Sequence, residues 1–165
     1  MAALLARLLS RSDSFKGRGN PYYGISIPSD LRRLWQLIEF TSLLPVLFGK
    51  FLLPAFFGNV IIAERYLPDF IVWVSLTTGD SNYSNSLVTK FLKALTNRAK
   101  VRIYVTARSD VLRYRKSDES LCPIEDQLAL YEKLSSSLDA FRLDTTNRNI
   151  EDSLSTVLHL VWRSV

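Results

Sequence analysis

The sequence RIYVTARSDVLRYRK, at residues 102–116, decides the predicted fold of this chain. Apolar side chains at every second position predict a β-strand over Val101–Thr106. Ser109-Asp110 then begins a helical pattern that extends to about Lys116. A strand that leads into a helix after a short turn is the repeating unit of parallel sheets.

Further strands and helices are predicted on both sides of this unit. Toward the N-terminus they are a helix over residues 2–12, a short strand over Tyr22–Ile27, a helix from Leu31 with Ser29-Asp30 as its cap, a strand over Val60–Glu64, and helices over Leu67–Ser75 and Asn82–Arg98. Toward the C-terminus they are a helix over Ile124–Leu138, a short strand over Ala140–Leu143 and a helix over Ile150–Trp162. Strands separated by helices predict an α/β fold with three layers, α/β/α, and a mostly parallel sheet, in one domain over residues 1–165.

Polar residues follow each of three predicted strands. They are Glu64-Arg65, Thr106-Ala107-Arg108 and Asp144-Thr145-Thr146. Ligands of open α/β sheets bind at the C-terminal ends of the strands. We therefore expect these three ends to converge on one crevice.

The positive charge of the chain is concentrated in one stretch. Lys90–Lys116 carries nine basic residues and one acidic residue, whereas residues 117–165 carry a net charge of −5 and the whole chain carries +5. A local basic cluster favours an anionic ligand over a generally basic protein, and no nucleic-acid partner is expected.

The composition excludes several classes of protein. A hydrophobic fraction of 47% excludes a disordered chain. Cys122 is the only cysteine and His159 the only histidine, so the chain has neither a disulfide framework nor the ligands of a structural zinc site. His159 lies in an apolar helical run, where a packed histidine is favoured over a catalytic one.

Two segments allow a targeting or membrane interpretation. The first 20 residues resemble a transit peptide, although an amphipathic helix packed on a core is favoured. Thr41–Ala63 is long enough to span a bilayer and has Lys50 as its only charge. Pro45 and Pro54 interrupt it, and a charge at the bilayer centre costs about 2.5–3.5 kcal/mol. The expectation is therefore a cytoplasmic chain without a membrane partner.

The order of these motifs resembles the thymidylate kinase family of P-loop nucleoside monophosphate kinases. VIIAERYLPDF resembles the family's strand ending in Asp-Arg-Tyr, with Glu64 in place of the usual Asp. RIYVTARSDVLRYRK resembles the strand, turn and helix that lead into the lid, here at about residues 113–123, with Arg115 at the motif arginine. Ile124–Leu138, with Tyr131, resembles the helix after the lid, and FRLDTT with NIEDSLSTVLHLVW resembles the last strand, the base loop and the terminal helix.

The resemblance implies a role for each candidate residue. Its catalytic set is Glu64, Arg65, Arg113 and Arg115, in which Arg65 holds the acceptor phosphate, Glu64 contacts the acceptor or the metal shell, and the lid arginines meet the donor phosphates. Its acceptor-binding set is Arg65, Trp35, Phe40 and Asp69, and its donor-binding set is Arg108, Asp144 and Thr145. ATP and Mg²⁺ are the implied cofactors and nucleotides the partners, with a homodimer left open. Taken alone, Glu64-Arg65 is better read as a salt-bridged strand end, and the lid arginines as a solvated helix face.

The family's phosphate loop, Gly-x-x-x-x-Gly-Lys-[Ser/Thr], does not occur in the sequence, because Gly49-Lys50 is followed by Phe51 and residue 44 is leucine. The predicted fold therefore lacks its first, central strand. We expect a truncated and impaired kinase that transfers phosphate from ATP to a (deoxy)nucleoside monophosphate. The alternative is a non-catalytic nucleotide-binding or assembly protein that keeps the kinase fold.

Overall fold

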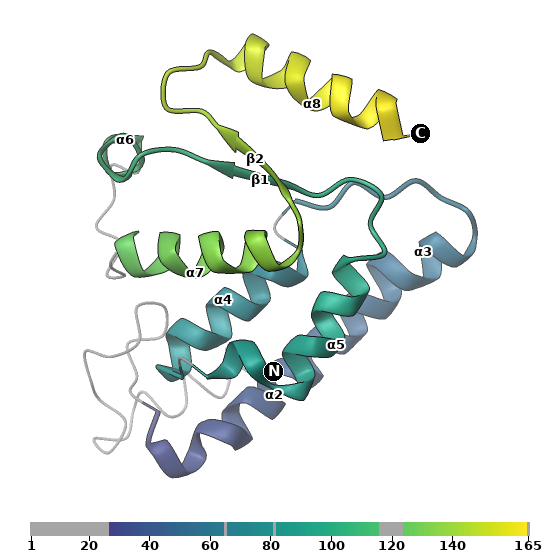
Figure 1. Cartoon of the computed structure of the whole chain (residues 1–165). Coiled ribbons are helices and arrows are strands. Elements are labelled where there is room, and N and C mark those ends of the chain that lie inside the picture. Colours follow the sequence, from purple (N-terminus) through teal and green to yellow (C-terminus); the bar gives the residue numbers. More distant parts are fainter. Residues whose placement is uncertain (1–26, 65, 81, 116–123, 165) are drawn as a thin grey trace. The chain divides into compact units, whose positions relative to one another are not determined.

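Figure 1 shows the computed structural model of the chain, which describes residues 27–64, 66–80, 82–115 and 124–164. The chain divides into two compact units, Met1–Lys90 and Phe91–Val165, and each is described by itself. The predicted helix over residues 2–12, most of the strand at Tyr22–Ile27 and most of the lid lie outside the described residues. The single domain stays a prediction.

The first unit is built on a long helical run. It comprises the 3₁₀ turn η2 (Ser29–Leu31), helix α2 (Arg32–Val46), the π-helical stretch η3 (Leu47–Leu52) and helix α3 (Leu53–Phe56). The helix predicted from Leu31 is confirmed, although no side chain of the predicted cap bonds to its first turn. Pro45 lies inside α2, and the wider π-helical stretch η3 follows it, so the helical run continues past this proline. Pro54 lies in the first turn of α3, where an amide N–H has no partner within the helix, so the missing N–H of proline costs no hydrogen bond.

Helix α4 (Leu67–Thr78) supplies much of the core of this unit. Its buried apolar side chains include Leu67, Ile71 and Val74, and the helix packs against α2. The helix predicted over Leu67–Ser75 is thereby confirmed, and it ends at Gly79, whose φ of 59° is the left-handed conformation that glycine adopts without strain.

Helix α5 (Leu87–Thr96) is shorter than the helix predicted over Asn82–Arg98. A separate 3₁₀ turn, η4 (Tyr83–Asn85), precedes it. The Oγ atom of Ser86 accepts a hydrogen bond from the Thr89 amide at 3.1 Å, so a serine cap starts α5 after this turn.

The strand predicted over Val60–Glu64 is wrong. These residues form no regular element, and Val60 and Ile62 are 93% and 95% exposed. A strand exists only when its amides and carbonyls pair with a neighbour. Both paired strands of the described residues lie in the other unit, and the apolar pattern alone did not reveal this.

The second unit contains a parallel pair of strands. Strand β1 (Ile103–Thr106) leads to helix α6 (Ser109–Arg115), and helix α7 (Ile124–Ser137) leads to strand β2 (Phe141–Asp144) and helix α8 (Ile150–Ser164). The register runs from Ile103 opposite Phe141 to Thr106 opposite Asp144. All five elements match their predicted positions. In Figure 1, α7 lies along one side of the strand pair and α8 along the other.

Two contacts hold the strand pair in place. The rings of Tyr104 on β1 and Tyr131 on α7 stack with their centroids 6.1 Å apart. The side chain of Arg102 donates hydrogen bonds to the carbonyl oxygens of Leu138, Asn97 and Ala99 at 2.8–3.1 Å. The arginine thus joins the end of α7 to the turn before β1. The described chain is mostly helical with a two-stranded parallel sheet.

Candidate functional site

The carboxyl ends of β1 and β2 meet, as predicted for parallel neighbours. The Thr145 amide donates to the carbonyl oxygen of Thr106 at 2.8 Å, and the Arg108 amide donates to Oγ1 of Thr146 at 2.9 Å. The two polar segments that follow the strands therefore form one bonded layer. We call Thr106, Arg108, Arg115, Asp144, Thr145 and Thr146 the strand-end site.

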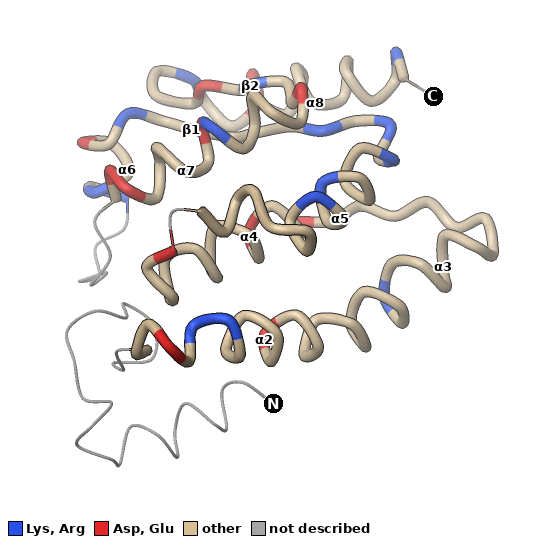
Figure 2. Tube along the Cα trace, turned by 60° about the horizontal axis from the view of Figure 1, so that its bottom comes forward, with Lys and Arg blue, Asp and Glu red and all other residues tan. Residues whose placement is uncertain are grey.

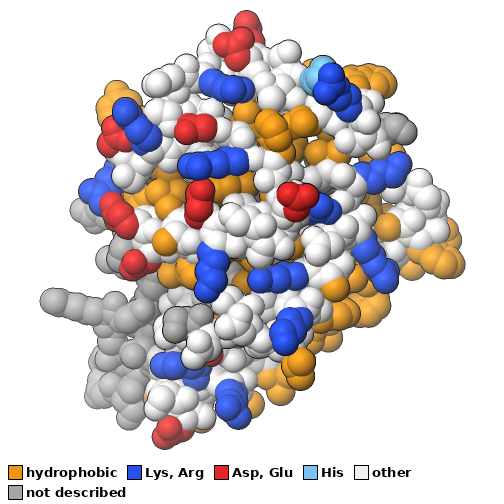
Figure 3. All heavy atoms as spheres, in the orientation of Figure 1, with side chains coloured by type: hydrophobic (Ala, Val, Ile, Leu, Met, Phe, Trp, Pro, Cys, Tyr) orange, Lys and Arg blue, Asp and Glu red, His pale blue; other side chains and the backbone are white. Residues whose placement is uncertain are grey.

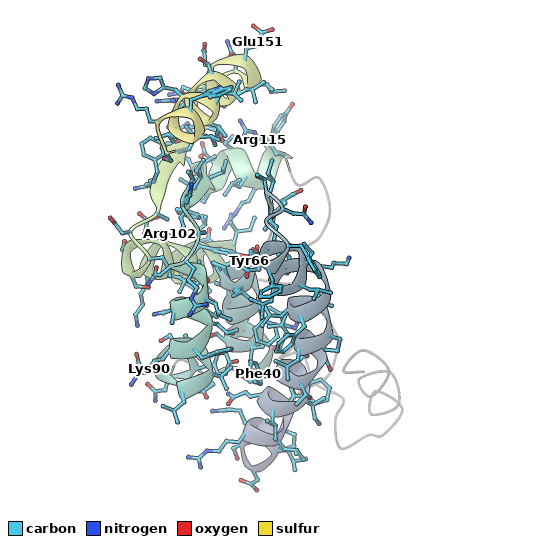
Figure 4. The ribbon with its side chains drawn as sticks, turned by 90° about the vertical axis from the view of Figure 1, so that its right-hand side faces the viewer. Phe40, Tyr66, Lys90, Arg102, Arg115 and Glu151 are labelled. Carbon is cyan, nitrogen blue, oxygen red and sulfur yellow. The ribbon has the colours of Figure 1, made fainter. Side chains whose placement is uncertain are left out.

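Arg115 enters the strand-end site from the last turn of α6. Its Nη1 donates to Oγ1 of Thr145 and its Nη2 donates to the carbonyl oxygen of Thr145, each at 3.1 Å. Figure 4 labels this side chain on α6. Both arms of one guanidinium are thus used on a single residue 30 positions away, at an exposed place.

Asp144 has an acidic carboxyl group in this site. The hydroxyl and the amide of Thr146 both donate to the carboxylate, and these bonds lower the pKa of Asp144 below its usual value, with smaller contributions from Arg142 and Arg108. Asp144 is therefore a carboxylate at neutral pH. Its charge lies beside the arginines of the site and offsets part of theirs.

The basic stretch at Lys90–Lys116 is less available than its charge suggests. Figure 2 shows Lys and Arg on α5 and on the chain leading from it to β1. Arg102 is bound to carbonyl oxygens, Arg108 pairs with Asp110 at 3.2 Å, and Arg113 pairs with Glu125. The exposure of both partners keeps these ion pairs weak. An anion can therefore compete with Asp110 for Arg108 at little cost.

The structure brings together only part of the predicted site. Arg108, Arg115, Asp144 and Thr145 meet, whereas the described partner of Arg113 is Glu125 at the start of α7. Glu64 is exposed on irregular chain in the first unit and does not end a strand. Because Val60–Glu64 forms no strand, the structure shows two of the three predicted strand ends together, and the convergence of Glu64 with them stays a prediction. Arg65 lies outside the described residues.

The predicted acceptor residues lie on two helices of the first unit. Trp35 is buried on α2, Phe40 is half-buried on the same helix, and Asp69 is half-buried in the first turn of α4. Figure 4 labels Phe40 on α2 and Tyr66 next to the start of α4. These positions leave the acceptor prediction open.

A buried polar cluster beside Trp35 was missed from the sequence. Nε2 of Gln36 donates to Oδ2 of Asp80 at 2.8 Å, and the residues Glu39 and Tyr83 are 6% and 2% exposed. Burial, together with the charges of Glu39 and Asp80, raises the pKa of the Tyr83 phenol. The polar spacing of Gln36 and Glu39 on an apolar helix was the available signal.

Two further features of the described residues bear on function. They include no group of three or more His, Cys, Asp or Glu side chains placed to hold a metal ion. They include one helical run, Ser29–Phe56, that is long and apolar enough to cross a membrane, with a mean hydropathy of 1.5 over its best window, of which 11% is buried.

Comparison of the chain with family models, with curated proteins and with solved structures gives no match in any of the three.

Proposed function

We propose that this chain is a nucleotide kinase-like protein of the thymidylate kinase type, and that the strand-end site binds the phosphates of the donor nucleotide. The single observation that supports the proposal most is Arg115, whose two guanidinium arms point at the end of β2 beside Arg108. Within this proposal, β1 and β2 belong to a three-layer P-loop kinase-like fold.

The chemistry of Arg115 suits a phosphate group. A guanidinium binds two oxygens of one phosphate through its paired N–H groups. In the structure the same two arms engage the hydroxyl and the carbonyl oxygen of Thr145. A phosphate can replace these neutral acceptors, because its charged oxygens form stronger hydrogen bonds with the guanidinium.

Side chains rather than main-chain amides carry this proposed recognition. The Thr145 amide is bonded to Thr106, and the Arg108 amide is bonded to Thr146. These two amides are therefore not free to bind a phosphate. The guanidinium groups of Arg108 and Arg115 are the proposed phosphate ligands instead.

Mg²⁺ enters the proposal only with the nucleotide. The described residues lack a protein-made cluster for a metal ion, and Mg²⁺ commonly binds through substrate phosphates with one or two carboxylates. ATP bound to Mg²⁺ is the proposed donor, and a deoxynucleoside monophosphate is the proposed acceptor. Trp35, Phe40, Asp69, Glu64 and Arg65 remain the proposed acceptor residues.

A non-catalytic nucleotide-binding protein is the second candidate function. The printed sequence contains no Gly-x-x-x-x-Gly-Lys-[Ser/Thr], and Glu64 lies on exposed irregular chain rather than at a strand end. Both observations favour binding without phosphoryl transfer, because transfer depends on groups positioned around the moving phosphate.

Calorimetry with ATP and Mg²⁺, followed by a radiometric transfer assay with dTMP, tests both candidates. We expect Arg115→Met to weaken ATP binding at least tenfold, since a charge-assisted hydrogen bond contributes about 1.5–3 kcal/mol. Arg163→Met, at the exposed end of α8, serves as the matched control and should bind like the wild type. Transfer to dTMP supports a kinase, binding without transfer supports the second candidate, and no effect of Arg115→Met refutes the assigned site.

A further inference from the structure

The apolar end of the long helical run is exposed in the structure. Phe56 and Phe57 are 84% and 71% exposed, and Val60 and Ile62, on the chain that follows, are 93% and 95% exposed. Figure 3 shows hydrophobic side chains gathered along the edge of the molecule over α3. We call the segment Leu53–Ile62 the apolar tip.

The apolar tip has a defined base. The rings of Phe51 and Tyr66 lie with their centroids 4.5 Å apart, so the chain that leaves the helix and the chain that returns to α4 are held together. The tip therefore offers apolar side chains to its surroundings from a segment whose two ends are joined.

Charge distinguishes the possible occupants of the tip. Lys50 is the only charged residue between Glu39 and Glu64, and it is exposed one helical turn before α3. An apolar segment with a single cation at its base suits a lipid surface, since the acyl region takes the apolar side chains and the anionic headgroups take the ammonium.

The length of the exposed segment indicates surface binding rather than a span. The helical part of the apolar tip, Leu53–Phe56, has four residues, or about 6 Å of helix, which is far shorter than a hydrocarbon core of about 30 Å. The preceding part of the helix is committed to protein, because Trp35 and Glu39 are buried and Gln36 is bonded to Asp80. Lipid cannot surround this part without breaking those contacts.

We propose that the apolar tip inserts into the interface of an anionic membrane and makes this chain a peripheral membrane protein. The tip enters the acyl boundary to a depth of about 5–10 Å, as interfacial apolar segments do, while Lys50 stays at the headgroups. The proposal runs against the sequence-based expectation of no membrane partner. The experiment below decides between the two.

Co-sedimentation of the full chain with lipid vesicles tests the proposal. Vesicles of phosphatidylcholine with phosphatidylglycerol should bind the chain, and vesicles of phosphatidylcholine alone should bind it about fivefold more weakly, as one cation near an anionic surface contributes ~1 kcal/mol. Phe56→Ser with Phe57→Ser should reduce binding by about tenfold for each phenylalanine. The matched control, Ile150→Ser with Trp162→Ser, removes two comparably exposed apolar side chains on α8 and should not change binding.

A fluorescent label places the inserted segment. In a Cys122→Ser background, an environment-sensitive dye on Phe57→Cys should shift to the blue with vesicles, whereas the dye on Leu37→Cys should not. Blue shifts at both positions would refute surface binding in favour of a span. Vesicle binding that the phenylalanine variants leave unchanged would overturn the proposal. A chain that does not bind vesicles, and instead forms a dimer by light scattering that requires Phe56 and Phe57, would also overturn it. Circular dichroism checks that each variant is folded.

Discussion

Replacing Tyr83 by phenylalanine should stabilise the first unit. Tyr83 is 2% exposed, and its hydroxyl is buried with no hydrogen-bond partner among the described residues. A buried hydroxyl without a partner costs about 1–3 kcal/mol, and phenylalanine keeps the ring in place. We expect the Tyr83→Phe chain to unfold with a free energy about 1 kcal/mol higher than the wild type. A Tyr→Phe change that removes a hydrogen-bonded hydroxyl usually lowers the free energy of unfolding instead.

The pH dependence gives a second measure of the same side chain. The pKa of Tyr83 is raised in the folded chain by burial and by Glu39 and Asp80, so the folded state keeps the phenol neutral while the unfolded state ionises near pH 10. A raised pKa of an acid makes the folded state lose stability as pH rises above the unfolded value. At pH 11 this loss reaches about 1.4 kcal/mol for one group, and Tyr83→Phe should be free of it.

Urea unfolding followed by tryptophan fluorescence measures both effects. Trp35 and Trp73 lie in the first unit, and Trp162 is 78% exposed, so the signal reports mainly on the unit that contains Tyr83. Tyr114→Phe, at a residue 89% exposed, is the control and should match the wild type. Destabilisation by Tyr83→Phe at pH 7, or an unchanged difference between pH 8 and pH 11, would refute the reasoning.

Three further predictions concern single contacts. Arg102→Met should lower the free energy of unfolding by about 2 kcal/mol, because it removes three hydrogen bonds, two of them solvent-exposed; a loss below 0.5 kcal/mol in urea unfolding would contradict this. Thr146→Val should raise the pKa of Asp144 toward 3.8 in a carboxyl NMR titration. In the wild type the stability from this carboxylate is lost as pH falls through the lowered pKa, so in the variant it should be lost at a higher pH. An unshifted titration would exclude the Thr146 hydroxyl as a cause, since valine keeps the amide bond. Gly79→Ala should destabilise by roughly 1 kcal/mol because φ is 59°, while Gly49→Ala, inside the helical run, should not; equal thermal shifts would contradict it.

The sequence predicted the strand-end site better than the rest of the candidate residues. Val101–Thr106 and Ala140–Leu143 are short and alternating or apolar, and each leads into polar residues, so their carboxyl ends could be placed together from the parallel pairing alone. The predicted residues Arg108, Arg115 and Thr145 do meet there.

The buried polar cluster beside Trp35 was harder to predict, because its residues carry no local pattern. The bond from Gln36 to Asp80 joins positions 44 residues apart, and burial of Tyr83 depends on how η4 packs after α4. The spacing of residues along one helix does not predict which residues of another segment they contact.

The sequence by itself determined where the helices of the second unit begin and end, since the periodicity that defines α7 and α8 is a property of neighbouring residues. Only the tertiary structure decided the state of Val60–Glu64. Its apolar residues fit a buried strand, but a strand needs a paired neighbour, and these residues are exposed without forming one. Local patterns arise within a segment, whereas pairing and burial depend on what folds beside it.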